Sequence, residues 1–304
     1  MSSADIRRGD GKRQWLRWAL ITPYVWLLLF LLAPFAIILK ISFADPLVAL
    51  PPFTPLLDWA QSGLDRLNVS LDNYIFLFGD RFYATIYLNS IKMAAIGTLL
   101  CLLLGYPMAY FIARQPAAWR NLLLLGVILP FWISFLLRVS AWIGLLNTNG
   151  IINNALMSIG LITEPLSLLY NDFAVYIGIA YSYLPFMILP LYATLEQLNL
   201  DLNDAAADLG ARRWQVFLDV TLPLSKPGLI AGCLLVFIPA IGEFVIPALL
   251  GGSDTLMIGR VLWDEFFVSR DWPVASAVSV VLLLILMLPI VWFQRTEARS
   301  TSPR

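Results

Sequence analysis

Long apolar runs separated by short polar segments dominate the chain. Six charge-free runs reach or approach the roughly 20 residues that cross the hydrocarbon of a membrane, and the two shorter ones continue past a single charge. The runs cover residues 18–39, 93–113, 121–137, 173–195, 227–242 and 272–294. The pattern predicts an all-α, polytopic membrane protein with six transmembrane helices.

Some boundaries of these helices can be estimated from single residues. We expect the second helix to open at Asn89 and the third to start near Asn121 and to run past Arg138. Pro185 and Pro190 are expected to break the regularity of the fourth helix. The polar stretch 147–172 then forms either a re-entrant segment or a segment on the outer surface.

Basic residues lie mainly on one side of these spans. Four lie on the other side, together with eleven acidic residues, whereas thirteen lie on the first: Arg7, Arg8, Lys12, Arg13, Arg17, Arg114, Arg120, Arg212, Arg213, Lys226, Arg295, Arg299 and Arg304. The positive-inside rule therefore predicts that both termini are cytoplasmic. The acidic outer face indicates either a preference for a cationic solute or only the exclusion of basic residues.

The spans and their orientation divide the chain into five expected segments. They are a cytoplasmic basic tail (1–17), a first transmembrane helix (18–41), an extracytoplasmic loop (42–85), a five-helix core (86–293) and a second cytoplasmic tail (294–304). The first apolar run is too long for the h-region of a cleaved signal peptide, and no small-x-small site follows closely. We therefore expect it to remain as an anchor, and the loop to be either a contact for a partner or a passive linker.

Composition excludes several classes of function. Residues are 60% hydrophobic and 13% charged, about half the charged fraction of a soluble domain, and histidine is absent. Both cysteines, Cys101 and Cys233, lie within predicted spans, which argues against a disulfide framework or a zinc site. The sequence also lacks a GxxxxGK[ST] phosphate loop and any evident pairing of a nucleophile with a base. We expect no enzyme activity, no cofactor or metal in this chain, and no nucleic-acid partner.

The cytoplasmic loop 196–226 contains an unusual polar segment. Leu202, Ala205, Ala206 and Leu209 fall on one helical stripe, and Asp204 lies off it. Gly210 permits the left-handed conformation that ends a helix, and a second apolar face begins at Trp214 and is expected to stop at Pro223. The spacing predicts a helix, a break and a second helix, either as a docking element or as an ordinary amphipathic connector.

Two ionisable residues lie within predicted spans. Glu243 is 16 residues from the start of the fifth run, and Arg138 lies about 17 residues into the third, so the two share nearly the same depth. Ionisable groups inside a membrane usually mark a pathway or pair with one another. Glu243 is therefore either a carboxylate that meets a passing cation or the partner of Arg138 in a structural pair.

Aromatic residues of the third and fourth spans form a second group of pathway candidates. Tyr176 and Tyr183 are seven residues apart, and Tyr181 begins a neighbouring stripe. Trp142 lies one turn beyond Arg138. Aromatic faces can hold ammonium groups by cation–π contacts of about 0.5 to 2 kcal/mol, although membrane-interface belts and ordinary packing also use such residues.

The segment 204–223 resembles the EAA loop of ABC importer permeases. The shared pattern is Asp-Ala-Ala at 204–206, Gly210, and Leu222-Pro223, with Asp204 where Glu is usual and Val220 where Ile is usual. Further stretches at 147–153, 242–252 and 257–273 resemble the permease subunits of bacterial polyamine importers. The resemblance covers nearly the whole chain from the first predicted helix to the sixth.

This resemblance implies a type I ABC importer permease fold and a role in the import of putrescine or spermidine across the inner membrane. It implies four kinds of partner: a second permease subunit, a cytoplasmic ATPase dimer that binds ATP and magnesium, a periplasmic polyamine-binding protein, and membrane lipid. Contacts with the ATPase would come from six residues: Asp204, Ala205, Ala206, Gly210, Leu222 and Pro223. The alternatives are a related importer for another solute, a secondary transporter that uses Glu243 as a proton site, and a non-conducting scaffold.

Overall fold

A computed structural model of the chain describes residues 21–55, 57–60, 63–67, 69–199 and 201–300. The expected basic tail 1–17, the start of the first helix and residues 301–304 lie outside the described residues. The chain divides into two compact units: Met1–Gly79 with Glu265–Val281, and Asp80–Asp264 with Leu282–Arg304. They are called unit 1 and unit 2 below, and each is described by itself.

Helices long and apolar enough to cross a membrane confirm the expected fold class. Five single helical segments meet this test among the described residues, and a sixth span results if the bent pair Arg213–Leu224 and Lys226–Ile241 is counted as one. The five are Ile21–Ser42, Arg81–Ala113, Phe135–Ser158, Asp172–Glu196 and Trp272–Val291. The chain is therefore a multi-pass, mainly helical membrane protein, as its apolar runs predicted.

Unit 1 contains one membrane-crossing helix and the elements that follow it. Its elements are η1 (Leu28–Leu32), α2 (Ala33–Ser42), the antiparallel strands β1 (Leu57–Ala60) and β2 (Gly63–Leu67), α3 (Asp72–Gly79), most of η4 (Asp264–Val268) and the start of α15 (Trp272–Ser300). Asn73 ties α3 to the end of α2 because its side-chain amide donates to the carbonyl oxygens of Ser42 (3.1 Å) and Ala44 (2.8 Å).

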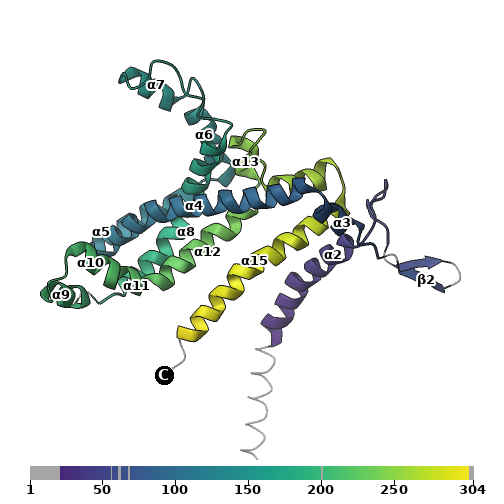
Figure 1. Cartoon of the computed structure of the whole chain (residues 1–304), viewed down its shortest axis with the longest axis horizontal. Helices are drawn as coiled ribbons and strands as arrows, with labels where there is room; N and C mark the ends of the chain where they lie inside the picture. Colours follow the sequence, from purple (N-terminus) through teal and green to yellow (C-terminus); the bar gives the residue numbers. More distant parts are fainter. Residues whose placement is uncertain (1–20, 56, 61–62, 68, 200, 301–304) are drawn as a thin grey trace, which may run out of the picture. The chain divides into compact units, whose positions relative to one another are not determined.

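Unit 2 holds the remaining elements. They are α4 (Arg81–Ala113), α5 (Ala117–Ile128), η2 (Leu129–Trp132), α6 (Phe135–Leu146), α7 (Ile151–Ser158), α8 (Asp172–Glu196), α9 (Asp201–Asp208), α10 (Arg213–Val216), η3 (Phe217–Thr221), α11 (Leu222–Leu224), α12 (Lys226–Ile241), α13 (Val245–Leu250), α14 (Ile258–Trp263) and the later part of α15. Helices α4, α8 and α12 run side by side and form the centre of the unit (Figure 1).

Glycines allow these three helices to approach closely. A Cβ at Gly228 of α12 would lie 2.6 Å from the carbonyl oxygen of Pro190 in α8, and one at Gly232 would lie 2.8 Å from the sulfur of Met187. On α4, a Cβ at Gly105 would lie 2.9 Å from Met187 as well. The GxxxG spacing at Gly228 and Gly232 is thus a helix contact, in agreement with its common use in membrane proteins.

The prediction of a continuous third helix is wrong. Instead of one helix from 121 to beyond Arg138, the structure has the short helix α5, the 3₁₀ turn η2 and a break before α6. Pro130 has no backbone N–H to continue an α-helical ladder, and Ile133 is extended with ψ 140°. Arg138 therefore lies on α6. The segment of this region that is long and apolar enough to cross a membrane is Phe135–Ser158, which includes the turn between α6 and α7 and so reaches into the stretch 147–172.

Three smaller boundaries also differ from expectation. Helix α4 begins at Arg81 rather than at Asn89, because the Asp80 carboxylate accepts from the Phe82 N–H at 2.8 Å and caps it. Helix α8 continues through Pro185 and Pro190 without a break. Pro223 does not stop its helix: it lies in α11, directly after the π-helical turn η3 has already interrupted the ladder, and the 67° bend comes at Ser225.

Candidate functional site

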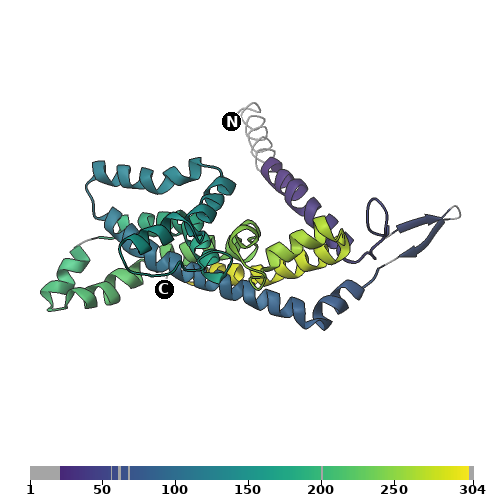
Figure 2. The ribbon, with the colours of Figure 1, turned by 90° about the horizontal axis from the view of Figure 1, so that it is seen from above.

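Unit 2 carries two features that the sequence analysis singled out: a polar cavity around Glu243 and the segment from α9 to η3. In both views of the molecule, α9 and α10 lie at one end of this unit (Figures 1 and 2). The cavity lies among α6, α8 and the junction between α12 and α13.

The cavity has a volume of about 460 Å³ and combines four polar side chains with an aromatic wall. Its polar lining is Arg138, Ser182, Tyr183 and Glu243, and its aromatic lining is Phe131, Phe135, Phe186 and Phe244. The phenyl rings pack on one another: Phe131 and Phe186 meet edge to face with centroids 5.1 Å apart. Such a site suits a small cation, because a carboxylate supplies the counter-charge and ring faces attract ammonium groups.

Glu243 is buried, with 7% of its surface exposed, and its carboxylate is held by three donors. The backbone N–H groups of Val245 (2.9 Å) and Ile246 (3.4 Å) donate to Oε1, and the Tyr183 hydroxyl donates to Oε2. The first two are at the N-terminal end of α13, where the peptide dipoles favour a negative charge. The local fold therefore orients this carboxylate before any solute arrives.

Arg138 lines the same cavity, but it does not pair with Glu243. An ion pair joins Arg120 to Glu196, with 2.7 Å between Nη1 and Oε1, but in the described part of the chain none at or below 4.0 Å joins Arg138 to Glu243. Arg138 is 6% exposed, and its Nε and Nη1 have no hydrogen-bond partner in the described part of the chain. Its guanidinium instead lies 5.1 Å from the ring centre of Phe131 and 5.6 Å from that of Phe135.

The other aromatic candidates lie apart from this cavity. Tyr181 is 37% exposed, meets Trp142 edge to face at 5.5 Å and lines a separate apolar hollow of about 420 Å³ beside α4 and α5. Tyr176 is half-buried and lines neither of these hollows. Of the pathway residues expected from sequence, the structure thus brings together Arg138, Tyr183 and Glu243.

The sequence did not identify the other lining residues, among them Phe131, Phe135, Ser182, Phe186 and Phe244. Their spacing along the sequence could have indicated some of them. Phe135 follows Phe131 by four residues and precedes Arg138 by three, and Phe186 follows Tyr183 by three. That spacing describes one helical face only if the chain is helical there. The break after η2 shows why the spacing alone was not decisive.

The segment from α9 to η3 has the expected helix, break and helix. Gly210 has φ +89°, and two backbone bonds close a Schellman motif around it: Ala211 N–H to Ala206 C=O (3.1 Å) and Gly210 N–H to Ala207 C=O (2.9 Å). The Gln215 side chain then accepts from the Arg212 N–H at 2.7 Å, which starts α10.

Apolar side chains of this segment face outward. Leu209 is 89% exposed, Trp214 58% and Leu202 49%, although α9 also carries three aspartates. Asp204 and Ala205 are exposed, Ala206, Leu222 and Pro223 are half-buried, and no atom lies within 4 Å of a Cβ at Gly210. An acidic helix with exposed leucines has the character of an interface for another protein.

The inner end of this segment is anchored to α4. The Tyr106 hydroxyl and the Ser225 hydroxyl lie 2.8 Å apart, and the rings of Tyr106 and Tyr110 meet Phe217 edge to face at 5.5 Å and 6.3 Å. Thr221 also donates to Asn203 of α9 at 3.4 Å. The exposed helices α9 and α10 are therefore connected to the helical core.

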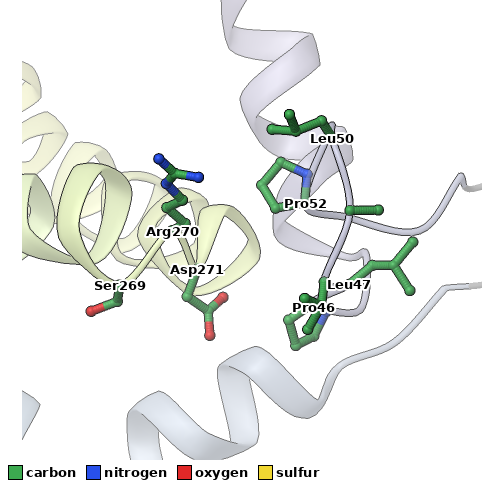
Figure 3. A pocket seen from close by; sticks show the side chains of 9 residues that line it. Pro46, Leu47, Leu50, Pro52, Ser269, Arg270 and Asp271 are labelled. Atoms are coloured by element: carbon green, nitrogen blue, oxygen red, sulfur yellow. The ribbon is translucent and has the colours of Figure 1, made fainter.

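Unit 1 has a hollow of its own, of about 590 Å³, between the loop 46–52 and residues 269–271. Figure 3 shows the side chains of Arg270 and Asp271 on one side, with Pro46, Leu47, Leu50 and Pro52 on the other. Leu50 is 85% exposed at the tip of this loop. The hollow lies in the expected extracytoplasmic region and contains none of the predicted pathway residues.

Comparisons with known proteins agree with this architecture. Residues 101–296 match the model of the family described as "Binding-protein-dependent transport system inner membrane component". The chain is 40% identical over 274 residues to the spermidine/putrescine transport system permease protein PotB of Haemophilus influenzae, covering 90% of this chain and 91% of that protein. It is equally similar to PotB of Escherichia coli, over 275 residues that cover 90% and 95% of the two chains.

A solved structure shows the same fold at lower sequence similarity. It is the crystal structure of a bacterial alginate ABC transporter in complex with an alginate pentasaccharide-bound periplasmic protein, with a TM-score of 0.67 and 19% identity. The match covers 97% of this chain and 98% of the other. The helices described above are therefore arranged as in a chain of an ABC transporter.

Proposed function

Because the chain belongs to the family of binding-protein-dependent transport system inner membrane components, we propose that it is the permease subunit through which an ATP-driven importer moves polyamines, putrescine or spermidine, across the inner membrane. The observation that carries this proposal is the Glu243 carboxylate, oriented by three donors within an aromatic cavity. The name of the PotB relatives supports the same solute class.

The cavity is proposed to hold a protonated amine during transport. Glu243 supplies the counter-charge, and Tyr183 keeps the carboxylate turned toward the cavity. Phe186 offers its ring to the methylene chain and to the ammonium group, and Phe131, which packs against it edge to face, completes the aromatic wall. Movement of a cation through a low-dielectric region requires a counter-charge of this kind. Trp142, Tyr176 and Tyr181 stay candidates for other stages of the pathway.

The energy source is proposed to be a separate cytoplasmic ATPase dimer that binds ATP and magnesium. The exposed stripe formed by Leu202 of α9 and by Leu209, which directly follows this helix, supplies a surface for that ATPase. Asp204, Ala205 and Ala206 also lie on α9. Gly210 sets the angle to α10, while Leu222 and Pro223 continue into the helical core. This chain conducts the solute and is not itself the enzyme.

Two further partners complete the proposed complex. A second permease subunit would close the pathway, and a periplasmic binding protein would deliver the polyamine, with the loop 42–85 as its expected contact. The part of that loop at residues 46–52, where Leu50 is 85% exposed, supports this role over a passive linker.

The proposal is tested by purifying the chain with its co-purifying subunits and measuring ATP hydrolysis and uptake in proteoliposomes. Addition of the periplasmic binding protein loaded with putrescine or spermidine should stimulate both, and the empty binding protein should not. Stimulation by a protein loaded with another solute, without any by the polyamine forms, would assign the chain to a different importer. Uptake driven by a proton gradient in the absence of ATP would instead support a secondary transporter.

The proposed orientation places both termini and Arg212 in the cytoplasm and Asp264 outside. Single cysteines at positions 212 and 264, in a background without Cys101 and Cys233, test it in intact spheroplasts. An impermeant thiol reagent should label position 264 alone. Labelling at 212 would reverse the orientation and remove the ATPase surface from the cytoplasm.

A further inference from the structure

Arg138 is a second, opposite charge in the cavity that the transported cation is proposed to enter. Its side chain is 6% exposed and lines the same cavity as Glu243, Tyr183 and Ser182. Among the described residues, its Nε and Nη1 have no hydrogen-bond partner, and no carboxylate lies within 4.0 Å of it. The positive charge of Arg138 is therefore buried without a direct ion pair to any described residue.

Two phenyl rings explain how this charge is tolerated. The guanidinium carbon of Arg138 lies 5.1 Å from the ring centre of Phe131 and 5.6 Å from that of Phe135. Cation–π contacts stabilise a guanidinium but leave its net charge in place. Contacts with two rings also restrict the position of the guanidinium, so its charge stays at the wall of the cavity.

Glu243 does not need Arg138 for its own position. Its Oε1 accepts from the backbone N–H groups of Val245 and Ile246, and its Oε2 accepts from Tyr183. The cavity thus carries one oriented negative charge and one fixed positive charge that do not cancel in a direct pair. An ammonium group is attracted by the first and repelled by the second.

We propose that Arg138 is a specificity-determining residue whose positive charge limits the cavity to one protonated amine at a time and so disfavours solutes that carry more ammonium groups. The inference rests on the proposed function. One ammonium of a linear polyamine pairs with Glu243, and each further ammonium that enters the cavity meets the guanidinium. Fixed positive charges exclude cations from other membrane pathways in the same way, and selectivity commonly uses repulsion as well as attraction.

The test compares maximal uptake of spermidine, with three amines, and putrescine, with two, in the complete complex with the same binding protein throughout. Arg138→Gln should raise the spermidine-to-putrescine ratio at least about threefold, because like charges repel strongly at low dielectric. Arg138→Lys keeps the charge without the planar group and should leave the ratio within about twofold of the parental value.

A second pair of variants leaves Arg138 and its contacts with Phe131 and Phe135 unchanged. Ser182 lines the same cavity, is 2% exposed, and its Oγ has no hydrogen-bond partner in the described ranges. Ser182→Asp places a carboxylate in the cavity and should raise the ratio as Arg138→Gln does. Ser182→Asn, of the same size but uncharged, should not. This pair decides the question if Arg138→Gln accumulates poorly.

Three results would overturn the inference. An unchanged ratio in Arg138→Gln and Ser182→Asp is expected if an acid of the second permease neutralises Arg138 in the complex. An equal change in Arg138→Lys would assign the effect to loss of stacking rather than of charge. An equal rise in Ser182→Asn would assign it to size. Import of neither polyamine by the parental complex would instead overturn the proposed function, which is a distinguishable outcome.

Discussion

The cavity around Glu243 and the α9–α10 segment depart from ordinary packing in opposite ways. In the cavity, Arg138 and Glu243 are buried among aromatic rings, whereas on α9 and α10 Leu209 and Trp214 are exposed. Lipid explains exposed apolar residues on the long helices, but not on a short helix with three aspartates. Buried charge and exposed apolar surface are both costly in isolation. Both departures fit the proposed function, in which a small charged solute completes the first region and a protein completes the second.

The largest effect is expected from Glu243→Gln, which tests the cavity side of this comparison. The change keeps the size of the side chain and removes its charge. Since hydrogen bonds to charged groups are worth about 1.5 to 3 kcal/mol, polyamine uptake should fall about ten- to a hundredfold at unchanged protein level. Initial uptake rates, normalised to the amount of protein in the membrane, measure it.

The double variant with Arg138→Gln guards against a structural explanation. If the second change restored both protein level and uptake, Arg138 and Glu243 would form a stabilising pair in the working protein, contrary to the hydrogen bonds described here. Unchanged levels with impaired uptake in both variants would keep the carboxylate in the pathway.

The next effect concerns the exposed stripe. Leu209→Asp should leave accumulation of the chain unchanged, because the side chain is 89% exposed, but should weaken binding of the ATPase at least about tenfold, since burial of a leucine is worth about 1.5 to 3 kcal/mol. Co-purification of the ATPase with the permease measures the change. Asp208→Asn, off the stripe, is the matched control, and an equal loss in that variant would contradict a specific role for the stripe.

Gly210→Val tests whether the angle between α9 and α10 matters as much as the stripe itself. Left-handed backbone costs an L-residue about 1 to 2 kcal/mol, so transport should fall severalfold while membrane insertion persists. No atom lies within 4 Å of an added Cβ, and the effect is therefore conformational. Gly210→Asn tolerates this conformation and should retain most of the activity. Parental uptake by Gly210→Val would show that the break plays no part in coupling.

The smallest effect is expected at Arg120 and Glu196, a pair between α5 and the end of α8 that belongs to neither region. The two side chains are 27% and 36% exposed, and exposed pairs contribute about 0 to 1 kcal/mol. Glu196→Gln should therefore change uptake less than about twofold in the assay used for Glu243→Gln. A larger loss would mean that removing an acidic side chain elsewhere in the protein also impairs transport. The loss expected in Glu243→Gln would then not be specific to the cavity.

The sequence predicted the α9–α10 segment well because its structure depends on residues that are close together in the chain. Spacing alone indicated the stripe, and Gly210 indicated the break that its φ of +89° confirms. Long apolar runs likewise predicted the helices α8, α12 and α15 within a residue or two at their starts. Pro223 was misjudged because the tolerance of a helix for proline depends on the preceding turn.

The cavity was only partly predictable, because its members come from distant parts of the chain. Equal depth suggested that Arg138 and Glu243 meet, yet depth does not determine the direction in which a side chain points. The hydroxyl that does bind Glu243 belongs to Tyr183, 60 residues away. Four similar tyrosines on one helix gave no reason to choose it. The break between η2 and α6 also changed which residues accompany Arg138.

Helix α4 has a consequence for how the two regions communicate. With 33 residues it is about 50 Å long. Near one end, Asn89 donates to the carbonyl of Leu256, and Ser90 accepts from the N–H of Ile258, next to the turn that bears Glu243. Near the other end, Tyr106 holds Ser225. A movement at either end of α4 is therefore expected to shift the residues that are hydrogen-bonded to its other end. Thermodynamic reciprocity then requires that, if bound nucleotide alters the affinity of the cavity for solute, an occupied cavity alters the nucleotide affinity of the ATPase by the same factor.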